Sequence, residues 1–218
     1  APNGLKGAEI TLGFPSVGAT ENIILAAVKA EGLTVIHNAA REPEISDLAD
    51  FLNSAGARIY GCGSDTVYIH GVKTLYSTEH SIIPDRIVAA TYMACAAITG
   101  GNITLKGTMP SHITSILSVL RETGCDISVS GKSVEINCKN RLTRVPTIRS
   151  LVYPGFPTDA GPLVIAMLCK AKGTSVFVEN IFENRFRYVD ELKRLGAKIE
   201  TQGKIAVIEG VSSLSGAT

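Results

Sequence analysis

Residues 173–211 read GTSVFVENIFENRFRYVDELKRLGAKIETQGKIAVIEGV, and this stretch decides the fold because its pattern occurs three times in the chain. The two earlier copies occupy residues 32–72 and 101–139. In each copy a glycine opens a short β-branched run, and a second glycine follows 24, 23 and 23 residues later, in chain order. The pattern therefore predicts one structural unit repeated with a period of about 70 residues.

Each copy predicts an amphipathic helix followed by a β-hairpin. Between the two glycines, apolar residues recur at intervals of three and four, as they do along one side of a helix. These residues are Leu48, Phe51 and Leu52, then Ile113, Ile116, Leu117 and Leu120, then Val189, Leu192 and Leu195. The second glycine is expected to end the helix in the left-handed conformation. Alternating runs joined by a turn then predict hairpins at 58–71, 126–138 and 198–210.

A second helix is predicted before the first glycine of each copy. Segments 18–30, 85–99 and 159–171 are almost apolar around the whole helix, which is typical of buried helices. Further strands lead into the first and third copies at 8–13 and 147–152. We therefore expect an α/β (α+β) fold of βαβαββ units with helices inside and sheets outside. A plain βαβ sandwich is the structural alternative, and it predicts amphipathic helices throughout.

Composition limits the classes of function. The chain of 218 residues has a formal net charge of +1 and no run of five like charges, which disfavours a nucleic-acid tail or a basic membrane patch. No apolar run approaches the roughly 18 residues of a spanning helix, and residues 1–10 lack the order of a signal peptide. Five cysteines without a C-x-x-C pair are expected to be reduced thiols of a cytoplasmic protein. The four histidines are scattered, so a metal ion is not expected. No cofactor is expected either.

Polar residues gather at two equivalent places in each copy, before the apolar helix and before the amphipathic helix. They are Ser16–Gly18, Arg41–Glu44, Asp85, Arg86, Pro110–His112, Thr158, Asp159 and Phe182–Arg185. Helix N-termini offer free N–H groups that suit phosphates. If these ends converge on one cleft, it holds a carboxylate base and an arginine for anions.

Every one of these residues has a structural alternative. Asp85 and Asp159 could only cap helices, and Glu42 with Glu44 could only fill a first turn. Arg185 could only pair on the surface with Glu183 or Asp190. The residues alone leave both interpretations open.

Five motifs occur in order: SVGATENI, NAAREPEI, PDRI, YPGFPTD and IFENRF. With them the chain resembles the UDP-N-acetylglucosamine enolpyruvyl transferases, also called UDP-N-acetylglucosamine 1-carboxyvinyltransferases, from about Gly4 to its last residues. The resemblance implies an inside-out α/β barrel of two lobes and six repeats, three of them in this chain. Residues 1–77 would be the last repeat of one lobe, 78–83 the hinge, and 84–218 two repeats of the second lobe.

The resemblance implies transfer of enolpyruvyl from phosphoenolpyruvate to the 3-hydroxyl of UDP-N-acetylglucosamine, with release of phosphate, as the first committed step of peptidoglycan synthesis. In the family the carboxylate that ends PTD takes the sugar hydroxyl proton, so Asp159 is expected to be the base. The rigid residues Pro154, Gly155 and Pro157 would hold it in place.

Binding roles are implied for residues on both sides of the expected hinge. Ser16, Val17 and Gly18 match the nucleotide-sugar segment, and Ile181 matches a position that contacts the uridine-sugar part. Arg185 resembles an arginine that binds the phosphoenolpyruvate anion, with Glu183 beside it.

Three further residues are implied at the periphery of the site. Asp85 and Arg86 match positions near the active site, and Glu42 matches a residue that helps to order the closed form. The chain departs from the family at Phe14, where a basic residue is common, and at 160–163, where the family usually reads Met-Gln-Ala-Gln.

The family's early lysine-asparagine pair, its mobile loop with a reactive cysteine or aspartate, and its late arginines have no counterpart here. The chain is therefore expected to be a fragment, inactive alone, whose partners are its substrates and the remaining segments of the same enzyme. None of its cysteines is expected to be the fosfomycin target. Two alternatives are a non-catalytic repeat module that binds a nucleotide sugar or a protein, and an RNA-cyclase-like protein, which the neutral charge disfavours.

Overall fold

The computed structural model describes residues 4–217, so the outer ends of the predicted domains, residues 1–3 and residue 218, lie outside the described residues. The chain divides into two compact units, the first ending at Ile83 and the second beginning at Pro84. This boundary falls at the end of the segment 78–83. The role of that segment as a hinge stays a prediction.

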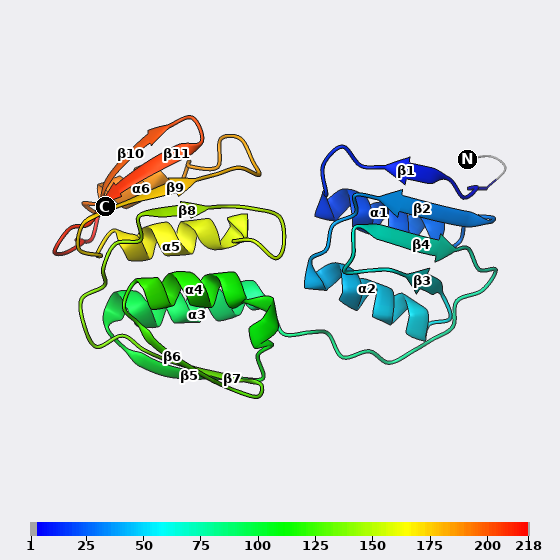
Figure 1. Cartoon of the computed structure of the whole chain (residues 1–218), viewed down its shortest axis with the longest axis horizontal. Helices are drawn as coiled ribbons and strands as arrows, with labels where there is room; N and C mark the ends of the chain where they lie inside the picture. The colour runs from blue at the N-terminus through cyan, green and yellow to red at the C-terminus, as the bar shows by residue number, and fades with distance from the viewer. Residues whose placement is uncertain (1–3, 218) are drawn as a thin grey trace. The chain divides into compact units, whose positions relative to one another are not determined.

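The first unit is a four-stranded sheet with two helices (Figure 1). Its elements are β1 (Glu9–Thr11), α1 (Val17–Ala27), β2 (Leu33–His37), α2 (Pro43–Ser54), β3 (Arg58–Tyr60) and β4 (Thr66–His70). The strand order is β1-β2-β4-β3, with β1 parallel to β2 and the other pairs antiparallel. Ile36 pairs with Val67, and both are fully buried, so the alternating strands turn one face toward the helices.

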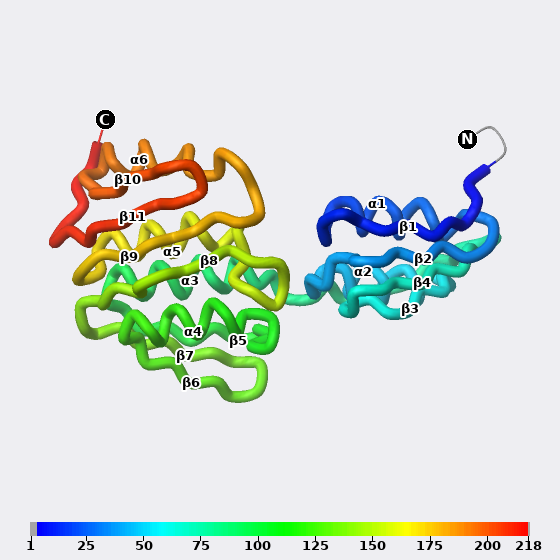
Figure 2. Tube along the Cα trace, turned by 45° about the horizontal axis from the view of Figure 1, so that its top comes forward, coloured from blue at the N-terminus to red at the C-terminus, as the bar shows by residue number. Residues whose placement is uncertain are grey.

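The second unit has two sheets with helices between them (Figures 1 and 2). Its first half contains α3 (Arg86–Thr99), β5 (Asn102–Lys106), η1 (Pro110–His112), α4 (Thr114–Glu122), β6 (Asp126–Ser130) and β7 (Ser133–Asn137). Its second half contains β8 (Thr147–Arg149), η2 (Thr158–Ala160), α5 (Gly161–Leu168), β9 (Thr174–Val178), α6 (Val189–Arg194), β10 (Lys198–Gln202) and β11 (Ile205–Glu209). The sheets have the orders β5-β7-β6 and β10-β11-β9-β8.

The predicted repeat is confirmed. Each copy contains a strand, a helix and an antiparallel hairpin, and parallel lead-in strands occur in the first and third copies. Gly56, Gly124 and Gly196, which end the amphipathic helices, have φ of 99°, 93° and 92°. Among residues 4–217 the sheets stay open and none closes into a barrel, so the inside-out arrangement appears in the second unit as two open sheets outside its helices.

The helices expected to be buried all round are only partly so. Helix α5 keeps most of its residues buried, whereas α1 exposes Leu25 and α3 exposes Val88 and Tyr92. The exposed residues of α3 recur every three to four positions, so one side of that helix packs on α5 and the sheets while the opposite side is left uncovered. An apolar sequence therefore overstated the burial of these two helices.

The prediction of five reduced thiols is wrong for one pair. Cys125 and Cys138 form a disulfide, with Cα atoms 4.6 Å apart. They flank the hairpin of β6 and β7, one step beyond the pair Asp126 and Asn137, so the antiparallel register places them opposite one another. Their spacing of 13 residues gave no motif that would reveal this.

Every helix within residues 4–217 falls short of the length and apolar character needed to cross a bilayer.

Candidate active site

The turn YPGFPTD is anchored in the core by the aromatic side chain of Phe156. Phe156 is buried and contacts Phe177 edge to face, with ring centroids 6.0 Å apart. The turn closes on itself, because the backbone N–H of Leu151 donates to the carbonyl of Phe156 at 2.9 Å. The next residues form η2, and Asp159 there keeps 59% of its side chain exposed. A buried anchor thus carries an exposed carboxylate.

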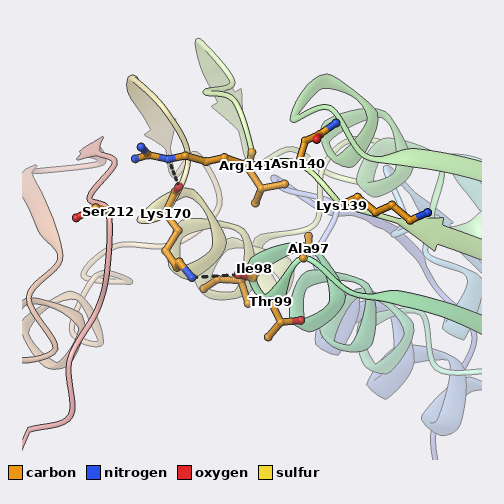
Figure 3. A pocket seen from close by; sticks show the side chains of 10 residues that line it. Ala97, Ile98, Thr99, Lys139, Asn140, Arg141, Lys170 and Ser212 are labelled. Carbon is orange, nitrogen blue, oxygen red and sulfur yellow. Dashed lines mark hydrogen bonds between the residues drawn. The ribbon is translucent and has the colours of Figure 1, made fainter.

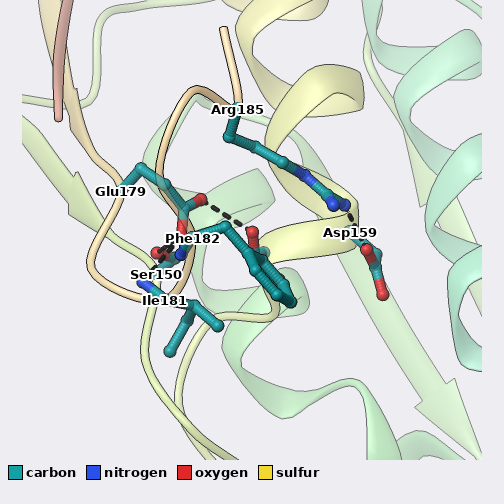
Figure 4. A network of polar contacts seen from close by, with 7 residues as sticks. Ser150, Asp159, Glu179, Ile181, Phe182 and Arg185 are labelled. Carbon is teal, nitrogen blue, oxygen red and sulfur yellow. Dashed lines mark hydrogen bonds and ion pairs between the residues drawn. The ribbon is translucent and has the colours of Figure 1, made fainter. Parts of the chain in front are cut away.

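The Asp159 carboxylate meets the guanidinium of Arg185, although 26 residues separate them (Figure 4). Nη2 of Arg185 donates to Oδ1 of Asp159. The same guanidinium lies 5.2 Å from the ring centroid of Phe182, which limits its freedom. No side-chain cap is made at the start of η2 or α5. Asp159 is therefore placed as the partner of a cation and not as a helix cap.

The alternative partners of Arg185, Glu183 and Asp190, lie on the surface. Asp190 lies 3.9 Å from Lys193 on the first turns of α6, and Glu183 is exposed. A carboxylate can accept the proton of a hydroxyl group, and a half-buried guanidinium beside it can bind an anion. Together they can bring the hydroxyl and the anion close to one another.

The start of α3 lies against the same turn. The guanidinium of Arg86 is 5.7 Å from the ring centroid of Tyr153, the first residue of YPGFPTD. Asp85 accepts hydrogen bonds from the backbone N–H groups of Ile87 at 2.7 Å and Val88 at 3.0 Å. For Asp85 the capping alternative therefore holds, while Arg86 stands close to the turn.

The loop after β9 carries a residue that sequence reasoning missed. The Glu179 side chain is 1% exposed and accepts backbone N–H bonds from Ile181 at 2.8 Å and Phe182 at 3.1 Å. Ser175, Phe177 and Glu179 are all buried, so the two-residue period of the strand continues into this carboxylate. That continuation was the available signal.

In the first unit, one buried hydroxyl joins the two candidate segments. Ser16 caps α1 by accepting from the N–H of Ala19 at 3.3 Å. Thr20 donates to the carbonyl of Ser16 at 2.8 Å and accepts from the N–H of Ala40 at 3.0 Å. SVGAT is thereby tied to NAAREPE.

The remaining candidates of the first unit stand at helix starts. Val17 and Gly18 form the first turn of α1. Glu42 is half-buried at the start of α2, and its side chain makes no capping bond there. The departure Phe14 is 46% exposed.

A hollow of about 260 Å³ lies elsewhere in the second unit, at the C-terminal end of α3 (Figure 3). Lys170 donates to the carbonyl of Ile98 at 3.4 Å, and Arg141 donates to the carbonyl of Lys170 at 3.3 Å. Both cations thus donate to backbone carbonyl groups, and the carbonyl of Ile98 lies in the last turn of α3. None of the predicted site residues lines this hollow. Within residues 4–217 there is also no cluster of three potential metal ligands.

Comparison with known sequences covers the whole chain. The family model EPSP synthase (3-phosphoshikimate 1-carboxyvinyltransferase) matches residues 1–218. UDP-N-acetylglucosamine 1-carboxyvinyltransferase 1 of Symbiobacterium thermophilum is 54% identical over 217 residues, which are 100% of this chain and 49% of that protein. UDP-N-acetylglucosamine 1-carboxyvinyltransferase 2 of Staphylococcus saprophyticus is 48% identical over 99% of this chain and 51% of its own length. The chain spans about half the length of the curated relatives it matches.

Two solved structures compare the fold alone. The enolpyruvyl transferase NikO from Streptomyces tendae superposes with a TM-score of 0.79 at 20% identity, covering 94% of this chain and 52% of that one. EPSP synthase from Acinetobacter baumannii superposes with a TM-score of 0.65 at 23% identity, covering 95% of this chain and 50% of that one. Both agree with the α/β class predicted from the repeats.

Proposed function

The chain belongs to the EPSP synthase family of enolpyruvyl transferases, and from this premise we propose that the full-length protein acts on UDP-N-acetylglucosamine. The reaction transfers enolpyruvyl from phosphoenolpyruvate to the 3-hydroxyl of the sugar and releases phosphate. Relatives named for this reaction are 54% and 48% identical to the chain over almost its whole length. This chain carries three repeats of that enzyme.

Addition and elimination give each proposed residue a task. The sugar oxygen attacks C2 of phosphoenolpyruvate while its proton passes to the Asp159 carboxylate, and C3 takes up a proton from solvent. Loss of a C3 proton and of the phosphate group then restores the double bond. Asp159 is the general base for the first step, and Arg185 neutralises the phosphoenolpyruvate anion.

The contact between Asp159 and Arg185 is the observation that carries this proposal. A base and an anion-binding cation must stand side by side if hydroxyl and phosphoenolpyruvate are to meet. The exposed carboxylate leaves room for a hydroxyl, and the guanidinium is held over Phe182. Arg86, beside Tyr153, adds positive charge near the same turn.

Some of the remaining residues are proposed to bind the nucleotide sugar, and the others to support the site around it. Ser16–Gly18 and Ile181 take the nucleotide-sugar side, and Glu183 stands beside Arg185. Asp85 supports the start of α3, and Glu42 orders the closed form.

We place this step in the cytoplasm, at the start of peptidoglycan synthesis. The disulfide between Cys125 and Cys138 removes the argument from reduced thiols. The proposal rests instead on the substrates, since sugar nucleotides and phosphoenolpyruvate are intracellular metabolites.

Phosphate release by the full-length protein tests the function. With UDP-N-acetylglucosamine and phosphoenolpyruvate, Asp159→Asn should lower kcat by about 100-fold or more, because the amide cannot accept the proton. Asp190→Asn is the matched control, since that carboxylate is 84% exposed beside Lys193. Wild-type protein that binds the nucleotide sugar without releasing phosphate would favour the binding module instead.

The isolated chain should release no phosphate, and adding the flanking segments should restore activity. An active isolated chain contradicts the view that it is a fragment.

A further inference from the structure

We propose that Glu179 is a positioning residue that holds the Asp159 turn and the Ile181–Arg185 loop against each other. Its effect on turnover rests on the proposed function, whereas its effect on the two loops stands on the geometry alone.

Glu179 is a buried carboxylate with four donors from three segments. Oε1 accepts from Oγ of Ser150 at 2.8 Å and from the backbone N–H groups of Ile181 and Phe182. Oε2 accepts from Oγ1 of Thr158 at 2.7 Å. Figure 4 shows Ser150, Ile181 and Phe182 gathered around this side chain, with Asp159 and Arg185 nearby. The three segments meet at one side chain.

The charge on this carboxylate is compensated by hydrogen bonds. Burial by itself would raise the pKa of Glu179, but the bonds from Thr158, Ser150, Phe182 and Ile181 outweigh burial and lower the pKa below its usual value. The group is therefore an ionised acceptor at neutral pH. Hydrogen bonds to a charged group are the stronger kind, so they restrain their donors tightly.

Two of the four donors are adjacent to the proposed base and cation. Thr158 immediately precedes Asp159, and Phe182 lies under the guanidinium of Arg185. Ser150 completes the link, since its Oγ also accepts from the N–H of Asn180 at 2.8 Å. A shift of Glu179 would thus move base and cation relative to one another, and misplacement of about 1 Å can cost about 100-fold in rate.

Glu179→Gln tests this role in the full-length protein. The amide keeps the size of the side chain but removes its charge, so the three bonds to Oε1 lose their charge assistance. The bond to Thr158 must also reverse, with the hydroxyl accepting from the NH₂ group. We expect kcat to fall by about 100-fold while the KM for each substrate changes by less than about fivefold. Glu200→Gln, an exposed acid on β10, is the matched control and should leave kcat unchanged.

Thr158→Val removes a single link and keeps the size of the side chain, so it answers the question even if Glu179→Gln fails to fold. Its kcat should also fall by about 10-fold or more, and the double variant should lose no more than about twofold beyond Glu179→Gln. Losses that multiply in the double variant, or wild-type kcat in both single variants, would overturn the proposal.

Amide hydrogen exchange separates this proposal from the proposed function. In Glu179→Gln the amides of Ile181 and Phe182 should exchange about 10-fold faster or more, while the amide of Phe177 is unchanged. If the wild type releases no phosphate, the proposed function fails and exchange still decides the geometry. Faster exchange throughout the second unit, or no change at Ile181 and Phe182, would show that Glu179 does not position these loops.

Discussion

Gly210 offers a test of how a hairpin closes onto a buried helix. It directly follows β11 and lies against Ala171, just beyond the end of α5. A Cβ added at Gly210 would lie 2.7 Å from the carbonyl carbon of Ala171 and closer still to its oxygen. Because real Cβ contacts essentially never fall below 3.0 Å, Gly210→Ala has to move the hairpin away from the helix end.

The cost follows from that displacement. Overpacking of a tight site costs about 1–3 kcal/mol. Two backbone bonds span the contact, from Gly210 to Gly173 at 3.0 Å and from Val211 to Cys169 at 2.7 Å. Each contributes about 1 kcal/mol net. We expect the free energy of unfolding to fall by about 3–5 kcal/mol, a large part of the ~5–15 kcal/mol of a typical domain.

Urea unfolding followed by far-ultraviolet circular dichroism measures this loss. With an m-value of about 2 kcal/mol/M, the midpoint should fall by about 2 M. Gly216→Ala is the matched control, because a Cβ there meets no atom within 4 Å, and its stability should change by less than about 0.5 kcal/mol. An unchanged midpoint for Gly210→Ala would refute the close approach of strand and helix.

Three further outcomes are expected. Iodoacetamide at pH 8 should label the exposed Cys95 well before Cys62 and Cys169, since burial raises the pKa of both of those thiols to about 11. Peptide mass spectrometry follows the labelling of each cysteine, and equal rates at the three sites would contradict this expectation. Glu179→Gln should destabilise the chain at neutral pH and lose this effect in acid: the folded-state pKa is depressed, so the contribution present above the usual 4.5 disappears as pH falls through the folded value. Thermal unfolding at pH 7 and about pH 3 compares the two proteins, and a difference that grows in acid would be the wrong sign. Phe177→Ala, at a side chain 1% exposed, should cost about 3–5 kcal/mol in urea unfolding, and a loss below about 1 kcal/mol would contradict its place in the core.

The hairpins could be predicted almost to the residue because their signals are local. In the last copy the predicted strands 198–202 and 205–210 match β10 and β11 to within one residue. Each combines two-residue alternation with a tight turn, which few other structures share. The apolar helices were less well defined, since α5 begins only at Gly161, after the 3-10 turn η2.

Contacts between distant segments could not be predicted in the same way. Cys125 and Cys138 meet because of the register of the hairpin. The odd number of cysteines gave no indication of this disulfide. The exposure of Tyr92 depends on what packs beside α3, and composition carries no such information.

The sequence suggested most residues of the candidate site, but not the residue that connects its two loops. Asp159 and Arg185 were expected to share a cleft only if the helix N-termini converge, and the structure brings the two side chains together. Glu179 was overlooked because it directly follows β9 on the inward-facing side, where the alternating pattern predicts an apolar residue and not an acid. Its four donors explain how the fold tolerates it there.

One carboxylate that accepts from Ser150, Thr158 and the backbone after β9 also constrains how such a sequence can evolve. Neither loop can change independently. Losing the acid leaves the buried Ser150 hydroxyl and the partly buried Thr158 hydroxyl without their acceptor, and losing a hydroxyl leaves the charge with fewer hydrogen bonds. Chimeras that take one loop from a distant relative without its counterpart should therefore be less active than either parent.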